Sequence, residues 1–189
     1  DNGEAIDAGA ATWVRGDLAT SGRVSPDNSL TGTSASDRVG ERVVPLTNGN
    51  YVVASRQWDR IDNPNAGAVT WRAGNGPYPA AVSPANSLVG VRPDHFVGGG
   101  PLIALSQGNY ALTVSGLDAV SSAAGMGAVI LGSGAGGLSG PTDGAIGLMG
   151  SNAGDEVGSG LFALANGHYV VTSSAWSSAS VQFVGAVTW

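Results

Sequence analysis

Histidine is the side chain best suited to proton transfer near neutral pH, and this sequence of 189 residues contains only two. His95 stands in the stretch Arg-Pro-Asp-His-Phe-Val-Gly, beside Arg92 and Asp94. In similar stretches elsewhere in the chain its place is taken by Asp37 and Asp155. We therefore interpret His95 as a surface loop residue rather than a general base, and no Ser-His-Asp order supports a nucleophilic triad.

The remaining polar residues also give little support for catalysis. His168 replaces a turn residue and is expected to point to solvent. Two histidines, scattered acids and no cysteine do not favour a zinc site. Paired carboxylates can hydrolyse glycosides, and the closest pairs are Asp155 with Glu156 and Asp59 with Asp62. Neighbouring loop acids are usually solvated surface charges, so we predict no catalytic residue, no metal site and no cofactor.

The composition limits the partners that the chain can have. A formal net charge of −6 and a pI near 4.5 disfavour nucleic acid and anionic membrane surfaces, because both attract clustered cations. No run approaches the roughly 18 apolar residues of a membrane helix, and the N-terminus shows no signal-peptide pattern. We expect neither nucleic-acid binding nor membrane insertion.

Aligning the chain with itself reveals a period of about 58 residues, and such a period determines the architecture. Stretches of the Gly-Ala-Val-Thr-Trp type end at Trp13, Trp71, Leu131 and Trp189, at offsets of 58, 60 and 58 residues. Tyrosines that follow a turn recur at Tyr51, Tyr110 and Tyr169. Residues repeated in every unit are better explained by packing than by a single site, so we predict that the recurring tryptophans lie in the core or between units.

Each period holds four short strand candidates. Two flank a turn such as Asn48-Gly49, one is the Gly-Ala-Val-Thr-Trp stretch, and the fourth is a Ser-Leu-x-Gly stretch. An Asn-Gly pair favours a two-residue turn, which predicts a tight antiparallel hairpin. Residues 51–54 and 68–71 are apolar at successive positions, which indicates that both faces of each sheet are covered.

The sequence therefore predicts an all-β single domain over residues 1–189, built from three repeats of four-stranded antiparallel, blade-like sheets. The approximate units are 1–58, 59–117 and 118–176, with a closing strand at 177–189. Stacked units of this kind form propellers, three-sided β-prisms or solenoids. We favour a partial β-propeller, or one completed by a second chain, with the prism as the alternative. The staggered terminal strands predict self-association into a homo-oligomer.

The order of motifs resembles the integrin-type propeller repeat with its Phe-Gly and Gly-Ala-Pro motifs. Phe96-Val97-Gly98 and the hairpin over residues 48–53 carry the likeness, which also extends to the arrays of secreted bacterial filamentous-haemagglutinin or adhesin proteins. The resemblance implies a secreted or cell-surface location. It does not bring calcium sites, because the turns at 47–50, 106–109 and 165–168 contain no carboxylate.

Variation between repeats is the best guide to a binding site. The connections after the second and fourth strands of a unit emerge on the same rim, and binding residues gather on such loops. In the first full unit these connections carry the candidate ligand-binding residues Arg56, Trp58, Asp59, Arg60, Arg92, Asp94 and His95. Arginine forks and an aromatic ring suit an acidic ligand or a sugar. We predict a non-catalytic repeat scaffold or adhesion module that recognises a glycan or a surface protein; the alternatives are a lectin-type propeller and, less favoured, a glycosidase-like enzyme.

Overall fold

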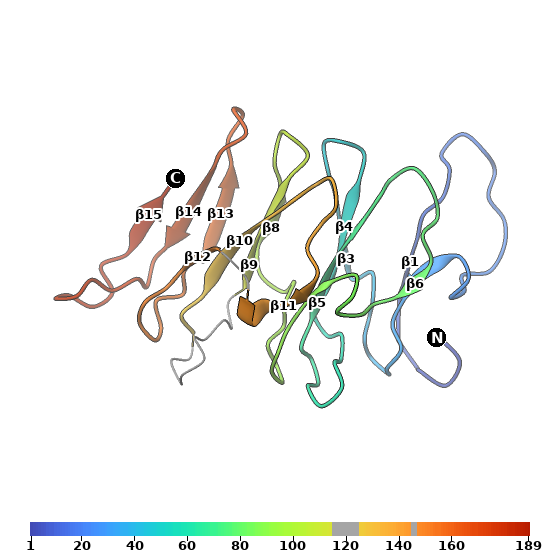
Figure 1. Ribbon diagram of the computed structural model, residues 1–189, viewed down its shortest axis with the longest axis horizontal. Coiled ribbons are helices and arrows are strands. Elements are labelled where there is room, and N and C mark those ends of the chain that lie inside the picture. Colours follow the sequence, from blue (N-terminus) through green and yellow to red (C-terminus); the bar gives the residue numbers. More distant parts are fainter. Residues whose placement is uncertain (115–124, 145–146) are drawn as a thin grey trace.

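The computed structural model describes residues 1–114, 125–144 and 147–189, which form four β-sheets (Figure 1). The first sheet contains β1 (Ala10–Thr12), β2 (Ser29–Thr31) and β6 (Ala80–Ala81). The second contains β3 (Arg42–Pro45), β4 (Tyr51–Ser55), β5 (Ala68–Arg72), β7 (Leu88–Val89) and β11 (Gly140–Pro141). The third contains β8 (Leu102–Ala104), β9 (Tyr110–Val114), β10 (Ala128–Gly132) and β12 (Gly147–Met149). The fourth contains β13 (Gly160–Ala163), β14 (Tyr169–Ser173) and β15 (Ala186–Thr188), and one short 3-10 helix, η1 (Thr142–Gly144), precedes β12.

The sheets follow one another in an open row, with the two termini at opposite ends (Figure 1). The all-β repeat character is confirmed, but the described residues form four sheets instead of three and no closed propeller or prism. Three periods span four sheets because the chain starts with the third strand of a unit and stops after the third strand of another. The predicted unit boundary at residue 58 therefore falls between β4 and β5 of one sheet, and the boundary at residue 117 lies outside the described residues.

The hairpin turn differs in detail from the prediction. Leu46 N–H donates to the Asn50 carbonyl (2.8 Å) and Gly49 N–H to the Leu46 carbonyl (3.1 Å), so the loop between the bonded residues Leu46 and Asn50 has three residues instead of two. Gly49 has a φ of 85°, whereas Asn48 stays at negative φ. This is the hairpin loop in which an ordinary turn is followed by one left-handed glycine, and only the glycine needs positive φ. The antiparallel pairing of β3 with β4, and its equivalents β8 with β9 and β13 with β14, is as predicted.

Two connections leave their own sheet and pair with the preceding one, which the sequence did not predict. After β5 the chain runs back to form β6, parallel to β2, and after β10 it runs back to form β11, parallel to β7. The recurring tryptophan of the preceding sheet binds each returning segment: Trp13 Nε1 donates to the Gly74 carbonyl (2.9 Å) and Trp71 Nε1 to the Gly134 carbonyl (3.0 Å). We call residues 72–82 and 132–142 the returning segments.

The returning segments approach the neighbouring backbone so closely that they need glycine. A Cβ on Gly134 would collide with the Gly108 carbonyl. The same carbonyl of Gly134 also accepts hydrogen bonds from the Asn48 and Asn50 side-chain amides, both at 2.8 Å. Each returning segment thus links two sheets through backbone contacts, and the neighbouring sheets are joined by more than side-chain packing.

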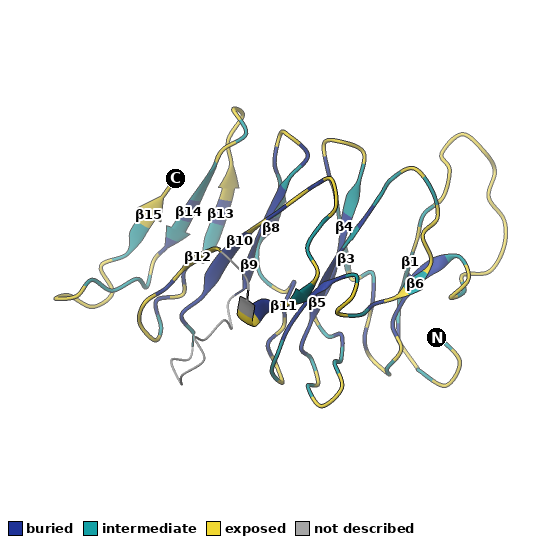
Figure 2. Cartoon of the chain, in the orientation of Figure 1, coloured by how far each residue is buried: buried dark blue, intermediate teal, exposed yellow. Residues whose placement is uncertain are grey.

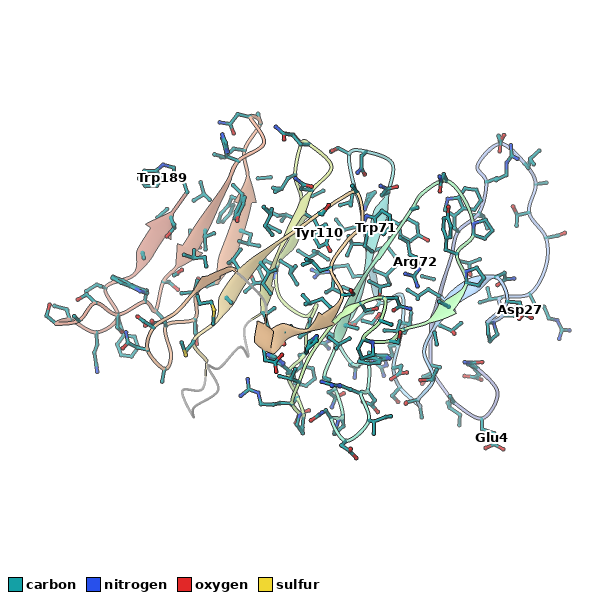
Figure 3. The ribbon with its side chains drawn as sticks, in the orientation of Figure 1. Glu4, Asp27, Trp71, Arg72, Tyr110 and Trp189 are labelled. Carbon is teal, nitrogen blue, oxygen red and sulfur yellow. The ribbon has the colours of Figure 1, made fainter. Side chains whose placement is uncertain are left out.

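The apolar core lies between consecutive sheets and is densest in the middle of the row (Figure 2). Between the second and third sheets, Val52 and Val69 pack in one cluster with Tyr110, Leu112 and Ile130. Figure 3 shows Trp71 and Tyr110 inside the row, and burial raises the pKa of Tyr110 to about 12. Both faces of the second and third sheets are therefore covered, as the apolar strand patterns predicted.

Trp189 is the exception to the predicted role of the recurring tryptophans. Its side chain is 92% exposed at the C-terminal end of the row (Figure 3), whereas Trp13 and Trp71 are half-buried. The difference has a structural cause: Trp13 and Trp71 each lie under a returning segment, and no described segment covers Trp189.

Candidate functional site

The two variable connections of the second sheet lie side by side at the end of the sheet opposite the hairpin turns (Figure 1). Asp94 N–H donates to the Pro64 carbonyl (2.9 Å), and Phe96 N–H donates to the Asn65 carbonyl (3.0 Å). The Asn65 side-chain amide donates to the Asp94 carboxylate at 2.9 Å. These bonds place residues 56–67 and 91–98 on one rim.

His95 is not a surface residue, which corrects the prediction. Its side chain is buried, and its Nδ1 accepts the Val91 N–H at 3.2 Å. Asp37, at the equivalent position, is also buried and accepts the N–H groups of Thr33 and Ser34, both at 2.8 Å. Asp37 closes the turn that follows β2, and His95 closes the turn that follows β7. A histidine and an aspartate can exchange here because each offers an acceptor to a backbone N–H.

Asp155 performs the same function in the third sheet and is not the solvated charge that its neighbour Glu156 suggested. Its carboxylate is buried and accepts N–H groups of Ser151, Asn152 and Ser177 at 2.9 to 3.0 Å. Burial raises the pKa of this carboxyl, but the three N–H donors outweigh burial and hold the pKa below its ordinary value.

At Asp37 the effect of burial on the pKa outweighs that of the N–H donors. Its second oxygen accepts the Asp59 N–H at 2.8 Å, so it also has three backbone donors. Burial nevertheless raises the pKa of the Asp37 carboxyl above its ordinary value, and the nearby Asp59 carboxylate adds to the increase. Both aspartates therefore have a structural role, because each closes a turn through hydrogen bonds from backbone N–H groups.

The structure does not bring the seven candidate ligand-binding residues into one patch. Arg56 is exposed and pairs with Glu41 at 3.2 Å, beside a small hollow at Gly98 and Gly99. Asp94 is exposed but bound by Asn65, and Arg92 is half-buried on the same connection. Trp58, Asp59 and Arg60 lie together at a different hollow.

That hollow, which we call the rim cleft, has a volume of about 490 Å³ and lies between the first and second sheets. Trp58, Asp59 and Arg60 come from the second sheet, together with the tip of their own connection at residues 61–64. The opposite wall is formed by residues that the sequence analysis did not identify, Thr33, Ser34, Val82, Ser83 and Pro84. They follow β2 and β6, and their proximity depends on the unexpected parallel pairing of these strands.

Trp58 gives the rim cleft its most specific feature. Its side chain is only 4% exposed and packs with Leu30 and Val53 in the core between the first two sheets. The indole Nε1 is buried without a hydrogen-bond partner among the residues that the structure describes. A buried N–H without an acceptor costs free energy, and the residue that carries this one lines the cleft. Asp59 is less available, because its carboxylate accepts the Asn65 N–H at 2.7 Å.

A larger cavity of about 740 Å³ lies between the third and fourth sheets. Its walls include Leu105, Asn109, Leu131, Tyr169 and Trp189. Between the second and third sheets the equivalent space is filled by the returning segment 132–142, whose Gly134 contacts Asn48, Asn50 and Trp71. The larger cavity is therefore an unfilled position in the packing of the repeats, and its apolar walls reflect that packing.

Two observations bear on metals and membranes. In the described part of the chain, no three His, Cys, Asp or Glu side chains gather closely enough to hold a metal ion. No helix among the described residues is long and apolar enough to span a membrane.

Comparison with known families identifies the repeat. A family model described as "Repeat of unknown function (DUF5650)" matches four times, over residues 1–41, 45–99, 104–159 and 163–189. The chain belongs to this family. The four DUF5650 matches correspond to the four sheets, so the repeat number is four where the sequence analysis predicted three. No curated protein and no solved structure matches the chain.

Proposed function

We propose that this DUF5650 chain is a non-catalytic repeat scaffold of a secreted or cell-surface protein and that it binds its partner at the rim cleft. The repeated side chains are used for packing and for closing turns, as the buried positions of Asp37, His95 and Asp155 illustrate. Part of the lining of the rim cleft, residues 59–64, lies on a connection whose sequence differs between repeats. The resemblance of the hairpins to repeats of surface adhesins supports the extracellular location.

The observation that carries the proposal is the buried Trp58 N–H without an acceptor at the wall of the cleft. A ligand oxygen placed there would satisfy this donor. The apolar surface of Val82 and Pro84 provides contact area beside it, which is the usual composition of a binding site: mostly apolar walls with a few placed polar groups.

A carbohydrate is the specific ligand class that this lining favours. Thr33, Ser34, Ser83 and Arg60 line the cleft together with the buried Trp58. Sugars present many hydroxyl acceptors and donors together with apolar ring faces, which match such a surface. A glycosidase is the least favoured of the proposed functions, because the Asp59 carboxylate already accepts a hydrogen bond from the Asn65 backbone N–H.

The experiment measures binding of the labelled chain to a glycan array and to a panel of extracellular proteins, with matched tryptophan variants. Trp58→Phe removes the N–H and keeps a ring, so loss of one hydrogen bond should weaken binding about tenfold. Trp176→Phe is the control, since Trp176 packs at the equivalent position between the third and fourth sheets. Equal binding by the wild type and Trp58→Phe would refute the rim cleft as the site, and a blank glycan array would remove the carbohydrate version.

A further inference from the structure

Asparagine is followed directly by glycine at four places in the sequence, Asn2, Asn48, Asn75 and Asn166. The backbone nitrogen of the glycine can attack the side-chain carbonyl carbon of such an asparagine, because glycine has no side chain to hinder the approach. The attack requires that the nitrogen and the carboxamide move together. Hydrogen bonds that hold either group in the folded chain therefore slow the reaction, and the four pairs differ in these bonds.

At Asn48 and Gly49 both reacting groups are held. The Asn48 Nδ2 donates to the Gly134 carbonyl at 2.8 Å, and its Oδ1 accepts the Asn50 N–H at 3.1 Å. The Gly49 N–H, which carries the attacking nitrogen, donates to the Leu46 carbonyl at 3.1 Å. The hairpin between β3 and β4 thus protects this pair.

Two of the other pairs are also held. Asn166 Oδ1 accepts the His168 N–H at 3.1 Å, and the Gly167 N–H donates to the Leu164 carbonyl at 3.1 Å, so the hairpin between β13 and β14 protects its pair in the same way. The Asn2 Nδ2 donates at 2.8 Å to the backbone carbonyl of the residue that follows β2.

The fourth pair, Asn75 and Gly76, lies in the returning segment 72–82 and lacks these restraints. Asn75 is exposed, and among the described residues neither its Nδ2 nor the Gly76 N–H makes a hydrogen bond. The carboxamide has one partner instead: Asn75 Oδ1 accepts the Tyr78 hydroxyl at 2.8 Å. The attacking nitrogen and the leaving nitrogen are therefore both unrestrained, and the carbonyl oxygen faces an O–H donor.

The Tyr78 hydroxyl is placed where the reaction develops negative charge. When a nitrogen adds to the Asn75 carboxamide, Oδ1 becomes an oxyanion, and a donor already bonded to that oxygen stabilises the transition state. Pro77 and Pro79 flank Tyr78, and their rings fix the backbone φ angle on either side of it, which limits movement of the turn. Tyr78 is 48% exposed, so water reaches the same place.

We propose that Asn75 is a site of spontaneous chemical modification, at which the Tyr78 hydroxyl promotes closure of a succinimide ring. The Gly76 nitrogen forms a bond to the Asn75 Cγ, the bond from Cγ to Nδ2 breaks, and Nδ2 leaves as ammonia with the proton of the Gly76 N–H. Water then adds to either carbonyl of the ring and opens it to aspartate or isoaspartate. The modification does not depend on a ligand at the rim cleft.

The products change the returning segment 72–82. Both carry a new negative charge, and isoaspartate also inserts a methylene group into the backbone. The insertion lies next to Gly74, whose carbonyl accepts the Trp13 indole N–H and whose N–H donates to the Asn50 side chain. The modification therefore acts on the junction between the first and second sheets.

The test follows each pair by peptide mass spectrometry while the folded chain is kept at neutral pH. Digestion with pepsin at acidic pH preserves the succinimide. Asn75 should convert about tenfold faster than Asn48 and Asn166, since each of those pairs must first break at least two hydrogen bonds. In urea the rates should converge, because glycine follows each asparagine. A rate at Asn75 no higher than at the other two, or the same lead in urea, would overturn the proposal.

Two substitutions test the ring closure and the hydroxyl separately. Tyr78→Phe keeps the ring and should slow conversion of Asn75 about threefold to tenfold, with no change at the other pairs. Gly76→Ala should remove most of the conversion, and its new Cβ would have no atom nearer than 3.8 Å, so the turn should keep its structure. Gly136→Ala, at the equivalent position of the other returning segment, is the matched control and should leave the rate at Asn75 unchanged. The proposal is wrong if Tyr78→Phe or Gly76→Ala converts as fast as the wild type.

Discussion

Val69 and Val187 occupy equivalent positions in two repeats, but replacing each by alanine should change the free energy of unfolding by very different amounts. Val69 is fully buried between the second and third sheets, and Val187 holds the same position on β15 of the fourth sheet, where it is exposed. Val69→Ala removes the equivalent of two methylenes at about 0.8 kcal/mol each. The cavity that remains adds to this loss, which gives a total of about 2 to 3 kcal/mol. Val187→Ala removes the same atoms from a largely solvated site and should cost less than about 0.5 kcal/mol.

The assay is urea unfolding followed by far-ultraviolet circular dichroism. For a chain of this size, each kcal/mol corresponds to roughly 2 to 4 °C in Tm, so Val69→Ala should also lower Tm by roughly 4 to 12 °C. Equal costs for the two variants would refute the reasoning, because equivalent repeat positions would then be equally covered.

Two further predictions follow from individual residues. Gly134→Ala should lower stability by about 2 to 4 kcal/mol in the same unfolding assay, because the new Cβ collides with the Gly108 carbonyl; Gly136→Ala, where no atom lies within 4 Å of the new Cβ, should change little, and equal effects would contradict the close approach. Asp155 has a lowered pKa in the folded chain, so its contribution is present above the ordinary carboxyl pKa of about 4 and is lost as the pH falls below it. Asp155→Asn should therefore flatten the decline of stability in that acidic range, and an unchanged pH profile would contradict the assignment.

The hairpins and the covered sheet faces could be predicted because their signals are local. Asn48-Gly49 marks a turn, and Val52-Val53 shows an apolar strand without alternation. The tandem repeat itself was visible in the same way. The number of sheets was not, because a period does not state where a sheet begins, and the chain enters its first sheet at the third strand.

The returning segments could not be predicted, and the rim cleft depends on them. Their parallel pairings involve only two residues each, Ala80–Ala81 and Gly140–Pro141, within glycine-rich stretches that lack a strand pattern. The opposite wall of the cleft, at residues 82–84, is positioned by the first of these pairings. Trp58, Asp59 and Arg60 were identified as candidates because they lie on a connection that varies between repeats, but their neighbours were not identified.

The sequence contained a signal for the burial of Asp37, His95 and Asp155, but we interpreted these residues as surface loop residues. These residues occupy one repeat position, and all can accept a hydrogen bond. A loop carboxylate is usually solvated, and that general tendency led to the wrong interpretation. An acceptor retained at one position in every repeat is better explained by a backbone N–H that needs it.

Nuclear magnetic resonance gives the most direct test of the claim that returning segments join each sheet to the one before it. In a chain of 18.6 kDa, interstrand nuclear Overhauser effects should connect Leu30 and Thr31 with Ala80 and Ala81, and Leu88 and Val89 with Gly140 and Pro141. The account predicts both sets of contacts in the monomer. Contacts of Ala80–Ala81 with β7 of its own repeat, and none with β2, would contradict it.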